Sequence, residues 1–152
     1  MKNNTKVLNL FLFLIIGFLF LSTSVISKEI NFKANEILSY EEGDLIVGKD
    51  NAEAIIDGEI EIYADKVTYN KKNEKLVAEG NVIVVDQINK IKINSNKINY
   101  NKIQNQLLSE GQTFFYIKDA YEIESYDVKY RINEEEIISN RKSNIKDEIG
   151  NK

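Results

Sequence analysis

The chain has 152 residues, of which 43% are hydrophobic and 29% are charged, and its formal net charge is −4. It contains neither cysteine nor histidine, which excludes disulfides, thiolate or imidazole metal sites, and Ser-His or Cys-His nucleophiles. The length fits one domain beside a targeting segment, and the acidic balance provides no basic surface for nucleic acid.

The first segment has the pattern of a secretory signal. Lys2 and Lys6 precede an apolar run, Val7–Leu21, and small polar residues follow it. A positive start, a short apolar stretch and a small-residue cleavage zone are typical of signal peptides, so we expect one over residues 1–27. An uncleaved anchor is the alternative, because extending the run to Ile26 gives about the 20 residues that cross a bilayer as a helix.

A pattern of about thirty residues recurs through the rest of the chain. One column of small residues is spaced by 30, 31 and 30 positions: Ala34, Ala64, Ser95 and Ser125. A second small column keeps a similar spacing: Gly48, Ala78, Ser109 and Ser139. Several columns that share one spacing indicate a true internal repeat.

Each repeat has the period of a β-strand. Apolar and polar residues alternate over 60–64 and 91–95, which is typical of strands with one buried face. The alternation slips by one residue near Asp65, and the slip predicts a β-bulge. Segments rich in Asn and Lys, such as 70–73, predict turns that lead into second strands, the next of them over 76–85.

These features predict an all-β protein built from about four stacked strand-turn-strand repeats. A repeat that cannot bury its apolar face alone must stack on its neighbours, which gives an elongated, twisted sheet. Such a stack leaves strand edges at both ends, and exposed edges favour pairing with another copy or a related domain. The last residues, 141–152, are polar, and we expect them to form a frayed tail.

Two stretches of the second repeat resemble a known family. Residues 64–70 (ADKVTYN) and 76–82 (LVAEGNV), with weaker copies at 95–101 and 109–113, resemble the organic-solvent-tolerance (OstA-like) domain. That domain is shared by the lipopolysaccharide-transport protein LptA and the N-terminal region of the outer-membrane assembly protein LptD. The resemblance covers about residues 30–140, and we expect the domain itself to span 28–140.

The resemblance implies a twisted antiparallel β-jellyroll that is open along one side and shelters the acyl chains of lipid A in an apolar groove. It implies a periplasmic protein, associated with the outer membrane and its assembly machinery, that passes lipopolysaccharide between OstA-like domains paired head to tail, with itself or with others. A stand-alone LptA-like bridge and a truncated LptD N-terminal region are both compatible with the sequence. An uncleaved signal would instead indicate an LptC-like component tethered to the inner membrane.

The alternation also predicts which side chains line the groove, because residues of one parity share one face of a strand. A one-residue error in register would turn all of them outward. The predicted lipid-binding residues are Ile60, Ile62, Ala64, Leu76, Ala78, Val82, Val84, Ile91, Ile93, Ser95, Leu107 and Ser109. The small members would leave space beside apolar walls. The alternative is that they only permit close packing of the sheet.

The remaining patterns favour structural roles. Tyr69, Tyr100 and Tyr130 share one column, and aromatic residues in register on stacked strands favour a structural ladder over a sugar-binding surface. The acidic run 134–136 lacks the spacing of a calcium loop and is expected to be solvated. We therefore expect no metal, no cofactor and no catalysis. A structural β-solenoid that binds no lipid, and a carbohydrate-active β-helix enzyme, are the alternatives from other functional classes.

Overall fold

The computed structural model describes residues 29–118 and 120–147, so the predicted signal peptide lies outside the described residues. Within this part the chain forms one antiparallel sheet of eleven strands and a single turn of 3-10 helix, η1, at Glu41–Gly43. The strands are β1 (Ile30–Lys33), β2 (Glu36–Tyr40), β3 (Leu45–Ile56), β4 (Ile60–Asn70), β5 (Lys75–Asp86), β6 (Ile91–Asn101), β7 (Gln106–Ile117), β8 (Tyr121–Tyr126), β9 (Lys129–Arg131), β10 (Glu136–Ile138) and β11 (Asn144–Asp147). The prediction of an all-β fold with antiparallel strands is confirmed.

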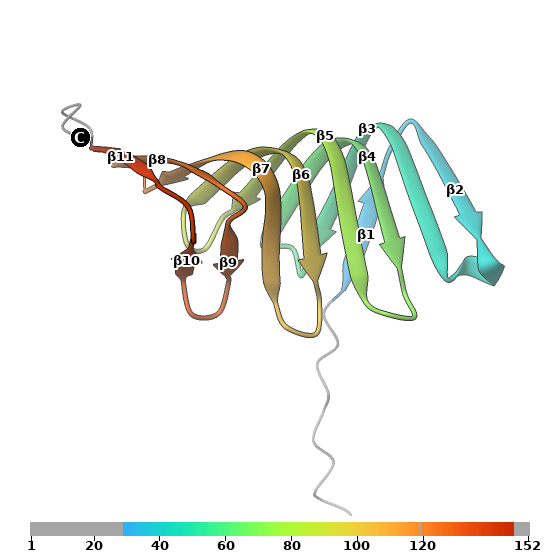
Figure 1. Ribbon diagram of the computed structural model, residues 1–152. Helices are drawn as coiled ribbons and strands as arrows, with labels where there is room; N and C mark the ends of the chain where they lie inside the picture. Colours follow the sequence, from blue (N-terminus) through green and yellow to red (C-terminus); the bar gives the residue numbers. More distant parts are fainter. Residues whose placement is uncertain (1–28, 119, 148–152) are drawn as a thin grey trace, which may run out of the picture.

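The sheet folds back on itself to form two layers. The second half of β3 pairs with β1, whereas its first half pairs with β2. At the other end, the second half of β7 pairs with β8 and its first half with β9. We call the layer that contains β1, β8 and β11 the first layer, and the layer that contains β2, β9 and β10 the second layer. The strands lie side by side along an arch from β2 and β3 at one end to β8–β11 at the other (Figure 1).

Every long strand is bent at a register shift. The bulge predicted near Asp65 is confirmed, because the pairing of β4 with β5 shifts between Tyr63 and Lys66. At the matching bends, Gly80 and Asn81 of β5 and Gly111 of β7 have positive φ, which glycine and asparagine adopt at low cost. We call this line of bends the crease. It joins the two layers and lets both halves of each strand turn their apolar residues inward.

The face between the layers is apolar and the outer face is charged. Buried residues from both layers form one hydrophobic core, and the stacked rings of Phe32 and Tyr69, with centroids 5.8 Å apart, join the first layer to the second. On the outside of the second layer, ion pairs such as Lys66–Glu79 and Lys97–Glu110 link neighbouring strands. The sheet is therefore solvated on one face only.

The turns follow the local chemistry that the sequence indicated. The side chain of Asn70 accepts hydrogen bonds from the backbone N–H groups of Lys72 and Asn73, at 3.0 and 3.2 Å. Asp57 and Gly58 have positive φ, as a tight hairpin between twisted strands requires.

The sheet continues into the segment that we expected to be a frayed tail. Strand β11 pairs with β8, opposing Ile145 to Ile123. Lys146 also forms an ion pair of 2.9 Å with Glu122 of β8. The sequence of β11, NIKD, is too short and polar to predict a strand. The strand is stabilised by pairing with the adjacent edge of the sheet. None of the described residues forms a helix that is both long and apolar enough to traverse a membrane.

Candidate functional site: the interior between the layers

All twelve residues that we predicted to line a groove lie on the inner face and are buried. Ile62, Leu76, Ala78 and Val84 are each 0% exposed, and the most exposed of the set is Ser95, at 9%. The alternation therefore assigned every one of them to the correct face. The ten apolar members pack into one core with the opposite layer, and the binding of lipid by any of the twelve stays a prediction.

The small residues of the set lie at the crease. Ala64 and Ser95 are the last inner residues of the first layer before the bend, and Ala78 and Ser109 occupy the equivalent places in the second layer. Space is short there. A Cβ atom added to Gly48, which shares the column of Ala78, would lie 3.2 Å from the Cβ of Ala34. The crease thus favours small side chains because the two layers approach each other closely, which supports the packing alternative for these four positions.

Buried hydroxyl groups bond to one another along the crease. The Thr113 hydroxyl donates to Ser109 Oγ at 2.8 Å and lies 3.2 Å from Ser95 Oγ, and Ser109 Oγ accepts from the backbone N–H of Val128 at 2.9 Å. These bonds satisfy groups that would otherwise destabilise an apolar core. Thr113 was not among the predicted residues, although its alternation with Phe115 places it on the inner face.

The large apolar residues form the walls of the interior, farther from the crease. A row of direct cross-strand partners crosses the first layer: Ala54, Ile62, Val84, Ile93, Phe115 and Ile123. A row of the second layer alternates tyrosine with aliphatic residues: Tyr69, Leu76, Tyr100, Leu107, Tyr130 and Ile137. The structural ladder predicted for the tyrosine column is confirmed, with one aliphatic residue between successive rings.

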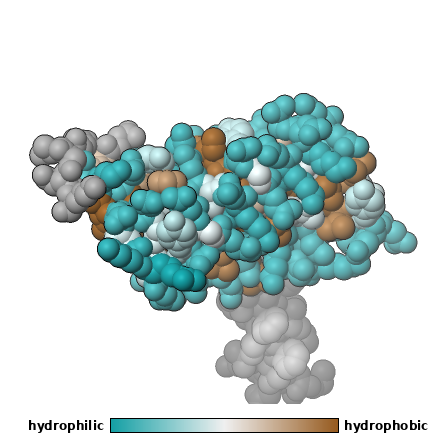
Figure 2. All heavy atoms as spheres, turned by 45° about the horizontal axis from the view of Figure 1, so that its top comes forward, coloured by the Kyte–Doolittle hydropathy of each residue, from teal (hydrophilic) through white to brown (hydrophobic). Residues whose placement is uncertain are grey.

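Among the described residues, apolar side chains line the walls of the interior from one end of the stack to the other. Partly buried Ile30, Phe32 and Ala34 extend the core at the β1 end. Ile123 and Ile137 extend it at the other end. Hydrophilic residues cover most of the face seen in Figure 2, and hydrophobic patches show toward both ends. The core therefore ends in apolar surface at each edge of the sheet.

The side of the interior opposite the crease is closed by tyrosines and a carboxylate. Asp86 is 2% exposed, and its Oδ2 accepts a hydrogen bond of 2.8 Å from the Tyr130 hydroxyl of the opposite layer. Asn89 Nδ2 lies 2.9 Å from both of these oxygens. Tyr100 instead donates to Asn105 of its own layer, at 3.2 Å.

Burial raises the pKa of Tyr100 and of Tyr130 above the ordinary tyrosine value. Desolvation is the main cause in both; the Asp57 carboxylate adds to it at Tyr100, and the hydrogen bond to Asp86 adds to it at Tyr130. Unfolded tyrosines ionise near pH 10, whereas these two keep their protons in the folded state. Their contribution to stability is therefore complete below about pH 10 and is lost as the pH rises beyond it.

We accordingly expect the free energy of unfolding, measured by urea titration, to fall as the pH is raised above about 10. The fall should be shallower in Tyr130→Phe, which has one buried phenol fewer. Tyr121→Phe, at an exposed position, is the matched control and should follow the wild-type slope. Equal slopes in all three proteins would contradict the assignment.

The described residues contain no group of three or more acidic side chains placed to hold a metal ion. The acidic run is exposed, as expected, and Glu136 pairs with Arg131 at 3.0 Å.

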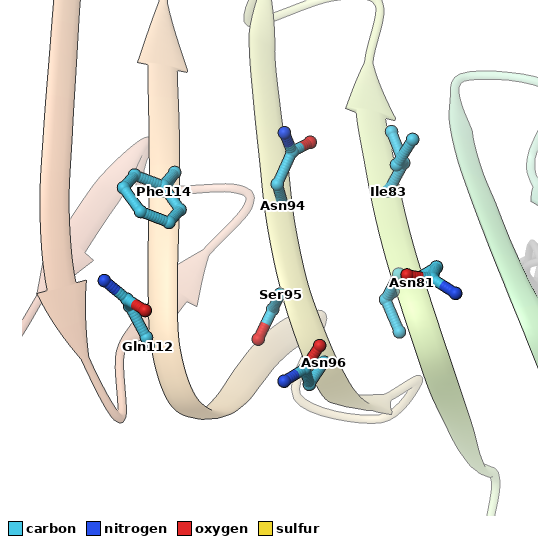
Figure 3. A pocket seen from close by; sticks show the side chains of 8 residues that line it. Asn81, Ile83, Asn94, Ser95, Asn96, Gln112 and Phe114 are labelled. Carbon is cyan, nitrogen blue, oxygen red and sulfur yellow. The ribbon is translucent and has the colours of Figure 1, made fainter.

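A hollow of about 340 Å³ lies at the bends of β5, β6 and β7 (Figure 3). Ile83, Asn94 and Phe114 are direct cross-strand partners there, and they alternate with inner residues, so they belong to the outer face. Amide side chains surround them, including Asn81 and Gln112. Amide and hydroxyl side chains make up much of this lining, whereas the walls of the interior are apolar, so the interior is the better candidate site for an acyl chain.

Comparison with solved structures supports the predicted fold. The chain aligns with LptH from Pseudomonas aeruginosa, described as the LptA-homologous periplasmic component of the lipopolysaccharide transport device, with a TM-score of 0.66 and 16% identity over 75% of this chain and 83% of that one. The resemblance to the OstA-like domain is thus confirmed as a fold: a twisted, unclosed β-jellyroll of the LptA type. No protein-family model and no curated protein sequence matches the chain.

Proposed function

We propose that this protein is a non-catalytic lipopolysaccharide-transport module that holds lipid A acyl chains between its two layers. The observation that carries the proposal is the continuous run of apolar wall residues, which reaches partly exposed aliphatic residues at both ends of the sheet. The fold shared with a periplasmic transport component supports the same function and location.

Burial provides enough free energy to hold a lipid. An acyl chain of about a dozen methylenes releases on the order of 10 kcal/mol when it leaves water, at about 0.8 kcal/mol per methylene. The inner side chains fill the interior in this structure. Part of the free energy released by burying the acyl chain is therefore offset by the cost of separating the layers. The walls formed by Ile62, Val84 and Phe115, rather than the tight crease, are where the acyl chain would lie.

The ends of the sheet suit onward transfer. Strands β1 and β2 form one end and β10 and β11 the other, and all of them are short. A second OstA-like domain that paired with either edge would align its own apolar interior with this one, because pairing extends both layers at once. The acyl chains could then pass from one domain to the next without entering water, in the direction of the outer membrane.

Two adjacent phenylalanines allow a matched test. Phe115 is 1% exposed on the inner face, and Phe114 lies on the outer face of the same strand. A photoreactive benzoylphenylalanine at position 115 should crosslink to a lipid A analogue when the mature protein is incubated with it, whereas the same probe at 114 should not. Absent crosslinking at 115, or equal crosslinking at both positions, would contradict the proposal.

The complete burial of the inner residues also favours a second candidate, a structural β-solenoid that binds no lipid. This candidate predicts that a fluorescent lipid A analogue does not bind and that neither probe crosslinks. N-terminal sequencing of the exported protein is a separate measurement, and it would distinguish a soluble bridge from an LptC-like tethered component.

A further inference from the structure

One inner row contains a carboxylate where every direct neighbour is apolar. This row is the last one of the first layer before the turns. Each member is the direct cross-strand partner of the next: Ile30, Ile56, Ile60, Asp86, Ile91 and Ile117. Asp86 stands between Ile60 and Ile91. An isoleucine there would continue the row, so the buried charge is not explained by packing of the first layer.

The carboxylate is held by groups on both sides of the interior. On its own side, the backbone N–H of Asn89 donates to Asp86 Oδ1 at 2.9 Å. From the opposite layer, the Tyr130 hydroxyl donates to Oδ2, while Asn89 Nδ2 reaches back across to the backbone carbonyl of Ile132 at 3.4 Å. Asp86, Asn89 and Tyr130 therefore bridge the two layers at the side opposite the crease, through polar contacts. At the β1 end the bridge between layers is apolar, formed by Phe32 and Tyr69.

We propose that Asp86, Asn89 and Tyr130 form a latch across a lateral entrance, and that an acyl chain enters the interior between the β5–β6 turn and β9. This inference rests on the proposed function for the nature of the ligand. The latch itself is a property of the free protein and is tested without lipid.

Polar contacts let the layers separate more readily here than at the β1 end. When the layers part, water replaces the hydrogen bonds of Asp86 and Tyr130 and hydrates the carboxylate, so little is lost. Separating Phe32 from Tyr69 exposes two aromatic faces to water with no such compensation. Removing only the Tyr130 hydroxyl leaves a buried acceptor without one of its donors, which favours opening, whereas replacing both partners by apolar groups restores a closed contact.

The absence of native cysteine allows opening to be measured by thiol labelling. Leu107→Cys places a thiol beside Tyr130, its direct cross-strand partner, at a position 2% exposed. Ala54→Cys places one at a position 0% exposed near the β1 end. We expect Tyr130→Phe to raise the rate of maleimide labelling about tenfold at position 107, and to leave the rate at position 54 unchanged, because one charge-assisted hydrogen bond is lost.

Tyr100→Phe is the matched control, since its hydroxyl bonds within one layer to Asn105. It should not change the labelling rate of the thiol at position 107. The double variant Asp86→Ile/Tyr130→Phe should label no faster than the wild type, because an isoleucine completes the row and the half-buried amide of Asn89 keeps the Ile132 carbonyl and water as partners. Equal acceleration by Tyr100→Phe and Tyr130→Phe, or a double variant that labels as fast as Tyr130→Phe, would overturn the latch.

The lateral entrance is tested by the uptake of a fluorescent lipid A analogue from detergent micelles. Tyr130→Phe should take it up faster than the wild type, and the double variant should not. Faster labelling at position 107 with unchanged uptake would overturn the entrance. A wild-type protein that takes up no lipid would refute the proposed function, while the labelling result would still decide whether the latch exists.

Discussion

Replacing Val84 by glutamate is expected to unfold the protein or nearly so. Val84 is 0% exposed and lies between Ile62 and Ile93 on the inner wall. A glutamate there must either bury a charge or take up a proton, and an uncompensated buried charge costs about 3–5 kcal/mol. Domains of this size have a total stability on the order of 5–15 kcal/mol, so the loss is a large part of the whole.

The adjacent residue is a closely matched control. Val85 has the same side chain but lies on the outer face, between Glu61 and Lys92 on the neighbouring strands. Val85→Glu should change the free energy of unfolding by less than about 1 kcal/mol, because this half-buried outer position lets the carboxylate reach water beside Lys92. Urea titration of the two variants measures the difference. Similar losses in both would mean that the two faces have been assigned incorrectly. Lipid capture is therefore better probed at Phe115, where an aromatic probe replaces an aromatic residue, than by a charge on the inner wall.

Replacing Gly80 by alanine is expected to cost about 2–5 kcal/mol. The residue has a φ of +80°, which costs an alanine roughly 1–2 kcal/mol relative to glycine. Its added Cβ would also lie 2.9 Å from the Cβ of Asp65 on the neighbouring strand, and overpacking of this kind adds about 1–3 kcal/mol. The displaced Asp65 would lose its hydrogen bond of 3.0 Å from Asn81.

Gly111 separates the two contributions. It occupies the corresponding bend of β7 with a φ of +81°, and an added Cβ there meets no atom within 4 Å. Gly111→Ala should therefore cost only the backbone term, about 1–2 kcal/mol. Thermal and urea unfolding of both variants check the comparison. If Gly80→Ala is no more destabilised than Gly111→Ala, the contact with Asp65 does not constrain the bend.

For the small residues, the sequence did not distinguish between two structural roles. Their columns were compatible with empty space for a ligand and with close packing, because periodicity reports which face a residue occupies and not what lies opposite it. The approach of Gly48 to Ala34 is created by the fold of the sheet. This close approach explains why small residues occupy the crease. An acyl chain would therefore lie against the walls of the interior.

By itself, the sequence determined the features that depend on near neighbours in the chain: the strand period, the bulge near Asp65, the Asn-rich turns and the inner face of each strand. These features are set by backbone sterics and local hydrogen bonding, and the same pattern recurs in each of the four repeats. Tertiary structure alone decided which repeats face each other. Tyr130 meets Asp86, 44 residues earlier, because the accumulated twist and bend of the sheet bring the two layers together with an offset that no single repeat encodes. The same long-range geometry pairs β11 with β8.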